Sequence, residues 1–223
     1  QEFDGKVYII GGNVRDLILN ENSKTHPDLV VNLDIKKLVY CLKKSKIKFL
    51  KTGEKFGSLV VFMKKYKFDL TSMRRDFKTD GRWAKVEFTN NLVQDSKRRD
   101  FTFNSIYCDT DGNLYDPNNG IDDLINRRVR FIGNTKKRIE EDYLRILRFF
   151  RFSILISQKF EEKDYQICRE YFNKIKLLSF DRRMQEMRKI ILSDIIKSVK
   201  ILPFVRKLIE KTLESKLNFR NFE

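Results

Sequence analysis

Residues 6–19 read KVYIIGGNVRDLIL, and this stretch decides the fold of the N-terminal part of the chain. Residues 7–10 are an apolar run typical of a buried strand, whereas residues 14–19 carry helical spacing. The pair Gly11-Gly12 between them marks a tight turn. The stretch therefore predicts a strand, a turn and a helix in direct succession.

The glycine pair also suits phosphate binding. Glycines let the backbone approach a phosphate, the start of the following helix offers N–H donors, and a guanidinium can clamp phosphate oxygens. The segment that supplies these groups contains Gly11, Gly12, Arg15 and Asp16. A simple tight turn is the competing interpretation, because a glycine pair is a far weaker signal than a complete P-loop.

Two kinds of periodicity divide the chain near residue 133. Before it, strand-like segments are expected at 27–32, 58–63, 66–73, 85–89, 114–116 and 129–133, with a polar break at 78–83. A Lys-Lys turn between 58–63 and 66–73 suggests a hairpin. Helices are expected at 35–44, where Asp34 can cap the first turn, and at 92–99. Beyond it, helical spacing covers 135–156, 161–177, 180–200 and 202–217. We therefore predict an α+β protein, with a mixed α/β head at 1–133 and an all-helical part at 134–223.

The amino-acid composition excludes several classes of protein. The 223 residues include 47 Lys and Arg against 31 Asp and Glu, which gives a net charge of +16 and favours a polyanionic partner. A hydrophobic fraction of 41% argues against a disordered basic arm. No apolar run approaches the roughly 18 residues of a membrane span. Three widely spaced cysteines form no disulfide framework, so we expect a reducing, cytoplasmic compartment.

Two predicted strands carry carboxylates. Asp28 precedes the apolar residues 29–31, and Asp69 lies within 66–73. Carboxylates at strand ends beside a phosphate-binding turn can hold Mg²⁺ for phosphoryl transfer. The competing interpretation is that each carboxylate is simply solvated at a strand edge.

Residues 98–104 read RRDFTFN and form the next candidate, with Arg99, Asp100 and Asn104 as its polar groups. Arginine suits bidentate contact with phosphate, and an adjacent aspartate can orient its guanidinium. In this segment Arg99 would bind phosphate and Asp100 would orient it. A solvated charged face is the alternative.

Residues 141–152 read EDYLRILRFFRF, with charges at every third position after Glu141 and large apolar side chains at nearly all others. A helix that is apolar around most of its circumference is buried, so its charged stripe faces a partner or a charged cleft. The stripe consists of Asp142, Arg145, Arg148 and Arg151, and spans roughly 13 Å, the reach of a nucleotide. A surface stripe on a two-sided helix is the alternative.

Taken in order, these segments resemble the class II tRNA nucleotidyltransferase and bacterial poly(A) polymerase family, whose head has a DNA polymerase β-like fold. The resemblance is carried by GGNVRDLIL (11–19), FDLTSMRRD (68–76), TDGRW (79–83), the stretch 97–124 from KRRDFTFN to GIDDL, EEDYLRILRFFRF (140–152) and LLSFDRR (177–183). These motifs span most of the chain, which makes the resemblance specific.

The resemblance implies an enzyme that adds C and A to tRNA 3′ ends from CTP and ATP, with release of pyrophosphate. Asp142 and Arg145 would pair with the incoming base; a carboxylate only accepts and a guanidinium only donates, which suits cytosine and adenine. The other implied nucleotide-binding residues are Gly11, Gly12, Arg15, Asp16, Arg99, Asp100, Asn104, Arg148 and Arg151. A poly(A) polymerase of the same family is the alternative.

One departure concerns the metal site. Where the family has two aspartates as D-x-D, this chain has His26-Pro27-Asp28. The implied metal-binding residues are Asp28, His26 and Asp69, with Asp28 and Asp69 as catalytic carboxylates. Neutral imidazole is a poor Mg²⁺ ligand and a better Mn²⁺ ligand, so Mg²⁺ is the expected ion and Mn²⁺ the alternative. An impaired nucleotide-binding remnant also stays open.

The length of the chain is its second departure from the family that it resembles. Members of the family usually continue through body and tail domains that grip the tRNA, whereas this chain ends at Glu223. We therefore expect a partial chain that covers the head, the neck and the start of the body.

Overall fold

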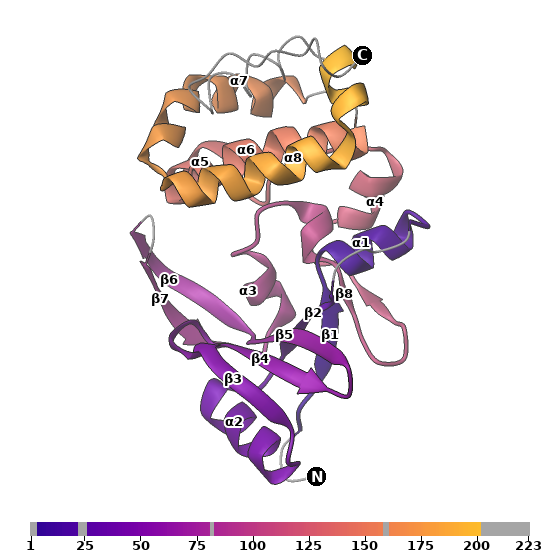
Figure 1. Cartoon of the computed structure of the whole chain (residues 1–223), viewed down its shortest axis with the longest axis vertical. Coiled ribbons are helices and arrows are strands. Elements are labelled where there is room, and N and C mark those ends of the chain that lie inside the picture. Colours follow the sequence, from indigo (N-terminus) through magenta and orange to yellow (C-terminus); the bar gives the residue numbers. More distant parts are fainter. Residues whose placement is uncertain (1–3, 22–25, 81–82, 158–160, 202–223) are drawn as a thin grey trace. The chain divides into compact units, whose positions relative to one another are not determined.

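The computed structural model describes residues 4–21, 26–80, 83–157 and 161–201. The chain separates into two compact units. The head unit comprises residues 1–126 and 130–133, and the helical unit comprises residues 127–129 and 134–223. Figure 1 shows the elements of both units.

A seven-stranded mixed sheet forms the centre of the head unit (Figure 1). Its order is β3 (Lys48–Gly53), β4 (Ser58–Met63), β5 (Tyr66–Ser72), β2 (Asp28–Val31), β1 (Val7–Ile10), β8 (Tyr107–Cys108) and β9 (Leu114–Tyr115). Strands β2 and β5 run parallel, and the other neighbours are antiparallel. A separate hairpin pairs β6 (Arg74–Asp80) with β7 (Trp83–Phe88).

Short helices connect these strands. They are α1 (Gly12–Ile18), α2 (Ile35–Lys44), α3 (Leu92–Ser96), α4 (Gly120–Ile125) and the 3₁₀-helices Glu54–Phe56 and Thr102–Ser105. Helix α2 begins after Asp34, whose carboxylate accepts the backbone N–H groups of Lys36 and Lys37 at 2.9 and 3.0 Å. This N-cap and the strand–turn–helix of β1 and α1 confirm the corresponding sequence predictions.

The two faces of the sheet carry separate apolar clusters. On one face, helix α2 packs in a cluster of Val31, Leu38, Leu42, Leu59, Val61 and Leu70. The other face carries Tyr8, Ile10, Val30, Met73 and Tyr107, with Leu92 of α3 against them. Alternation along each strand sends neighbouring side chains to opposite faces. We call the second face the α3 face.

Helix α4 holds the 3₁₀-helix Thr102–Ser105 in place. The Asp116 carboxylate accepts the N–H groups of Gly120 and Ile121, both at 2.8 Å, and so caps the start of α4. From within α4, the buried Asp123 carboxylate accepts the Thr102 hydroxyl at 2.6 Å and Arg130 Nε at 2.9 Å. The segment DPNNGIDDL therefore supports the turn that carries Asn104.

Gly120 is expected to tolerate no side chain. A Cβ atom there would lie 2.4 Å from the Thr102 carbonyl oxygen and 2.8 Å from Phe103 Cα, both backbone atoms. We expect Gly120→Ala to lower the free energy of unfolding by about 3 kcal/mol, because the backbone must move to relieve the overlap. Urea titration followed by circular dichroism measures this loss.

Gly112→Ala is the matched control for that measurement. Gly112 has φ +87° but nothing within 4 Å of its Cβ position, so only left-handed backbone strain, about 1 kcal/mol, is expected there. An equal loss in the two variants would contradict the close packing of α4 against residues 102–103.

The described part of the helical unit contains four α-helices. They are α5 (Thr135–Glu141), α6 (Leu144–Phe152), α7 (Glu162–Glu170) and α8 (Phe180–Ile201), with a π-turn at Ser153–Ser157 and a 3₁₀-helix at Phe172–Leu177. Helix α6 buries Ile146, Leu147, Phe149, Phe150 and Phe152. This burial confirms the prediction from its nearly continuous apolar circumference.

The prediction of one continuous helix over 135–156 is wrong. The backbone of Asp142 is extended, with φ −158° and ψ 108°, so α5 ends at Glu141 and α6 starts at Leu144. The Asp142 side chain accepts the N–H of Leu144 at 3.1 Å, a local side-chain-to-backbone bond of the kind that competes with helix continuation.

Several further elements differ from expectation. The helix expected at 161–177 is divided into α7 and the 3₁₀-helix Phe172–Leu177, and strand β8 was not predicted. The strand expected at 129–133 is reduced to one bridge, Phe101 to Phe131. Residues 78–80 and 83, within the segment expected as a polar break, form the paired ends of β6 and β7, because cross-strand pairing outweighs composition there. Strand β3 was not predicted, and the helix expected at 202–217 lies outside the described residues.

Two further features concern membrane crossing and the cysteines. Among the described residues, no helix combines the length and apolar character that crossing a membrane requires. Cys41, Cys108 and Cys168 are free thiols, and Cys168 is buried.

Candidate active site

The turn between β1 and α1 lies against Asp28. Gly11 has φ 75° and ψ −134°, a conformation that favours glycine. A Cβ atom at Gly11 would lie 3.5 Å from Asp28 Oδ2, so the turn backbone passes close to this carboxylate. A bound group that contacts the turn is therefore also close to Asp28.

Arg15 and Asp16 form a local pair on α1. The Arg15 Nε donates to Asp16 Oδ1 at 2.8 Å, and both side chains are largely buried. A Cβ atom at Gly12 would lie 3.7 Å from Arg15 Nη2, which places this guanidinium beside the glycine turn. Asp16 therefore contacts Arg15 and sets the orientation of the Arg15 guanidinium.

Asp28 and Asp69 are direct neighbours across the parallel pair β2 and β5. Adjacent strands lie about 4.8 Å apart, and paired residues in parallel strands project from the same face. Because Asp28 and Val30 are two positions apart on β2, Asp28 shares the α3 face with Val30, and so does its register partner Asp69. Both aspartates are exposed, and so is His26, two residues before Asp28.

Metal-ligating residues are sparse around this pair. Among the residues that the structure describes, no three His, Cys, Asp or Glu side chains gather as a metal-binding group. The two neighbouring carboxylates are therefore the core of any cation site on this face, and further ligands would have to come from a bound substrate or from water.

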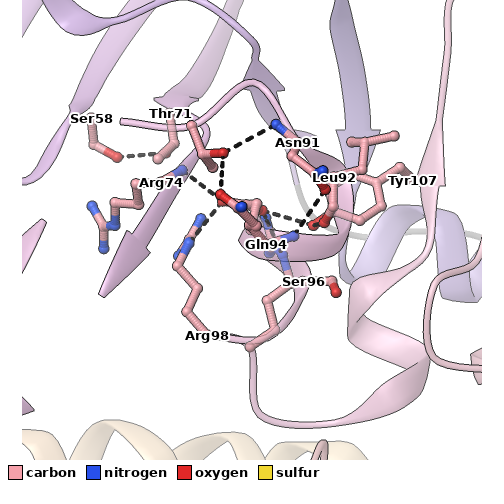
Figure 2. Close-up of polar contacts among 12 residues, drawn as sticks. Ser58, Thr71, Arg74, Asn91, Leu92, Gln94, Ser96, Arg98 and Tyr107 are labelled. Atoms are coloured by element: carbon pink, nitrogen blue, oxygen red, sulfur yellow. Dashed lines mark hydrogen bonds and ion pairs between the residues drawn. The ribbon is translucent and has the colours of Figure 1, made fainter. Parts of the chain in front are cut away.

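A fully buried carboxylate, Asp95 of α3, receives the arginines of the RRD segment. It accepts Arg98 Nε at 2.8 Å, Arg99 Nη2 at 3.1 Å and the Tyr107 hydroxyl at 2.8 Å. The backbone N–H of Arg74 donates to it as well, at 3.1 Å. In Figure 2, the Arg98 side chain and the Tyr107 hydroxyl are directed toward α3, whereas Arg74 approaches the helix with its backbone N–H and not with its side chain.

The charge state of this cluster follows from its partners. Burial alone raises the pKa of Asp95, but Arg99, Arg98 and the hydrogen bond from Tyr107 together hold that pKa below its ordinary value. Burial raises the pKa of Tyr107, so its hydroxyl keeps its proton and remains a donor. Asp95 is therefore a carboxylate at neutral pH.

Asp100 and Asn104 lie together in the neighbouring turn. Asp100 Oδ1 accepts the N–H of Phe101 at 2.9 Å and Asn104 Nδ2 at 3.2 Å, and both side chains are buried. The sequence suggested Asp100 as the carboxylate that orients Arg99. The structure adds a second carboxylate, because Asp95, four residues before Arg99 in the sequence, accepts this guanidinium at 3.1 Å. The role suggested for Asp100 stays a prediction.

In the helical unit, Asp142 and Arg145 each have a defined partner. Asp142 Oδ2 accepts Arg182 Nη2 of α8 at 2.9 Å. Arg145 Nη1 donates to Glu141 Oε2 at 2.6 Å and to the Arg138 carbonyl oxygen at 2.7 Å. The two predicted base-reading groups are thus oriented by other groups of the same unit.

Arg148 and Arg151 continue the charged stripe along α6. Arg151 forms an ion pair with Glu186 of α8, which is buried, and its guanidinium carbon lies 4.0 Å from the centre of the Phe152 ring. The guanidinium carbon of Arg148 lies 5.6 Å from the centre of the same ring. Arg151 therefore helps to join α6 to α8, and its contact with nucleotide stays a prediction.

The structure groups the predicted site residues by unit. The head unit holds Gly11, Gly12, Arg15, Asp16, His26, Asp28, Asp69, Arg99, Asp100 and Asn104, and the helical unit holds Asp142, Arg145, Arg148 and Arg151. Sequence reasoning missed four partners of these residues, namely Asp95, Glu141, Arg182 and Glu186. The i, i+4 spacing of Asp95 to Arg99 and of Glu141 to Arg145 was a usable signal, whereas the pairs to α8 had none.

Comparison with known proteins agrees with this arrangement. The family model of the poly A polymerase head domain matches residues 7–130. CCA tRNA nucleotidyltransferase 1, mitochondrial, from Mus musculus is 38% identical over 190 residues, which cover 83% of this chain and 44% of that protein. The CCA-adding enzyme of Lactobacillus helveticus (strain DPC 4571) is 32% identical over 188 residues, which cover 82% of this chain and 45% of that protein.

A solved structure shows the same fold. The crystal structure of Bacillus stearothermophilus CCA-adding enzyme in complex with CTP matches with a TM-score of 0.77 and 27% identity, covering 96% of this chain and 49% of that chain. The mixed sheet with helices, followed by a helical part, is therefore the expected α+β fold. This chain spans less than half the length of the curated relatives named above.

Proposed function

Because the chain belongs to the poly A polymerase head domain family, we propose that it is the head and neck portion of a tRNA nucleotidyltransferase. This enzyme would add C and A to tRNA 3′ ends from CTP and ATP and release pyrophosphate. One observation carries the proposal: Asp28 and Asp69 are neighbours on parallel strands, and the Gly11 turn passes close to Asp28. Two carboxylates beside a glycine turn suit nucleotidyl transfer.

The residues of the head unit would bind and orient the triphosphate. The glycine turn lets phosphate oxygens approach the backbone, and the guanidinium groups of Arg15 and Arg99 neutralise their charge. The RNA 3′-hydroxyl oxygen attacks the α-phosphorus, the bond to the bridging oxygen of the β-phosphate breaks, and pyrophosphate leaves. Positioning and charge neutralisation supply most of the catalysis in such transfers.

The donor set fits a divalent cation. Mg²⁺ is commonly bound through one or two carboxylates together with substrate phosphates, and Asp28 with Asp69 supplies that number of carboxylates on one face. A bound divalent cation supplies Lewis-acid polarisation of phosphate oxygens. We propose Mg²⁺ as the ion, with Mn²⁺ as the alternative because His26 stands two residues before Asp28.

Base selection would rest on Asp142 and Arg145. The Asp142 carboxylate accepts an amino group of cytosine or adenine, and the Arg145 guanidinium donates to the adjacent ring acceptors. Guanine and uracil present the opposite pattern on that edge. The partners Arg182 and Glu141 would hold the two reading groups in orientation.

The test is single-nucleotide extension of a tRNA that lacks its CCA end, with each of the four triphosphates and with Mg²⁺ or Mn²⁺ in parallel. Extension by CTP and then by ATP supports the proposal. Repeated extension by ATP alone indicates a poly(A) polymerase. Binding of CTP or ATP without product in either metal indicates a remnant that has lost catalysis, and extension by all four triphosphates contradicts base selection by this pair.

A further inference from the structure

We propose that Asp95 is a positioning residue, which holds the Arg99 guanidinium in the orientation that meets the nucleotide phosphates. The inference rests on the proposed function, because it takes Arg99 as a phosphate ligand. It concerns a residue outside the motif RRDFT, within the short helix that precedes it.

Burial is the first observation. Asp95 has 0% of its surface exposed, and a carboxylate is costly to remove from water unless donors surround it. Its two oxygens accept from Arg98, Arg99 and Tyr107 at 2.8 to 3.1 Å. A buried ion pair contributes little net stability, because removing its charges from water is costly. The buried charge of Asp95 therefore indicates a positioning role.

The second observation is that separate elements fix the carboxylate. Tyr107 belongs to β8, and the Arg74 backbone N–H, at the start of β6, donates to Asp95 at 3.1 Å. Helix α3 is itself capped, since Asn91 Oδ1 accepts the N–H groups of Val93 and Gln94 at 2.8 and 3.2 Å. In Figure 2, Asn91 lies at the start of α3, and Arg74 and Tyr107 lie beside this helix. The carboxylate is therefore held by neighbouring strands as well as by its own helix.

The third observation is the placement of Arg99. Its Nε and Nη2 donate to Asp95 Oδ2 at 3.3 and 3.1 Å, and its guanidinium carbon lies 5.5 Å from the centre of the Tyr107 ring. Tyr107 belongs to the apolar cluster of the α3 face, which is also the face of Asp28 and Asp69. Asp95 thus fixes one edge of a guanidinium on the face that carries these two carboxylates.

The test compares Asp95→Asn, Arg99→Ala and the double variant by CTP and ATP binding and by the separate values of KM and kcat. Asparagine keeps the size of the side chain but removes the charge, so Arg99 loses its fixed orientation. We expect Asp95→Asn to weaken triphosphate binding roughly tenfold to a hundredfold, mainly in KM, as misplacement of a binding group does. When Arg99→Ala is already present, Asp95→Asn should cause little additional loss of triphosphate affinity, because the two residues act as one unit.

Two further variants separate positioning from folding. Tyr107→Phe removes one donor and keeps the charge, so we expect about a threefold loss of affinity. Asp164→Asn is the matched control, because Asp164 is buried and accepts the Thr135 hydroxyl at 2.6 Å within the helical unit. It should lower thermal stability without changing triphosphate binding.

The outcomes distinguish the inference from the proposed function. If Arg99→Ala weakens binding and Asp95→Asn does not, the inference is overturned and the proposed function stands. If Arg99→Ala has no effect, both the phosphate role of Arg99 and the inference fail. Equal losses from Asp95→Asn with and without Arg99 also overturn the inference. If Asp95→Asn does not fold, an unchanged affinity in Tyr107→Phe overturns it.

Discussion

His26→Asp is expected to raise the rate of CTP incorporation in Mg²⁺ by roughly a hundredfold. Metal contacts supply several kcal/mol of transition-state stabilisation, and each factor of ten corresponds to about 1.4 kcal/mol. A second carboxylate two positions before Asp28 would supply an oxygen ligand that Mg²⁺ prefers over imidazole.

Direct ion binding provides the independent readout for this prediction. Titration with Mn²⁺, followed by electron paramagnetic resonance, should show tighter binding in His26→Asp than in the unchanged chain. Asp28→Asn is the control, and we expect it to lose both ion binding and extension. Tighter ion binding without any gain in rate would contradict the prediction that position 26 limits catalysis.

Arg145→Ala is expected to lower kcat/KM for CTP and ATP by roughly 100-fold to 1,000-fold, the loss typical of removing a hydrogen-bond donor from a preorganised site. The variant should also lose discrimination against UTP and GTP, because one half of the reading pair is gone. Arg145 is partly buried and held by Glu141 and the Arg138 carbonyl, so its donors are ordered.

The matched control for this prediction is Arg169→Ala. Arg169 lies on α7 in the same unit and is exposed, so its loss should change neither nucleotide binding nor selection. Competition binding with all four triphosphates, together with extension kinetics, checks both variants. Unchanged CTP and ATP binding in Arg145→Ala would indicate a basic RNA-binding protein in which this helix reads no base.

Local patterns predicted much of the fold. The apolar run before Gly11 became β1, the Asp34 cap began α2, and the Lys-Lys turn joined β4 to β5 as a hairpin. Each of these depends on residues within a few positions of one another, where periodicity and turn chemistry act directly. The break at Asp142 was missed because the helical apolar spacing continues on both sides of it, and that spacing was given more weight than the tendency of an aspartate side chain to accept a nearby backbone N–H.

The sequence by itself determined the strand, turn and helix around Gly11, the buried character of α6 and the set of charged residues available for a site. Only the tertiary structure decided which charges meet. Asp28 lies beside Asp69 because β2 and β5 pair in parallel, and Asp142 meets Arg182 because α8 packs in the same unit as α6. The two residues of each pair are 40 or 41 positions apart in the sequence. Their contact depends on how whole elements pack, and local residue spacing does not predict it.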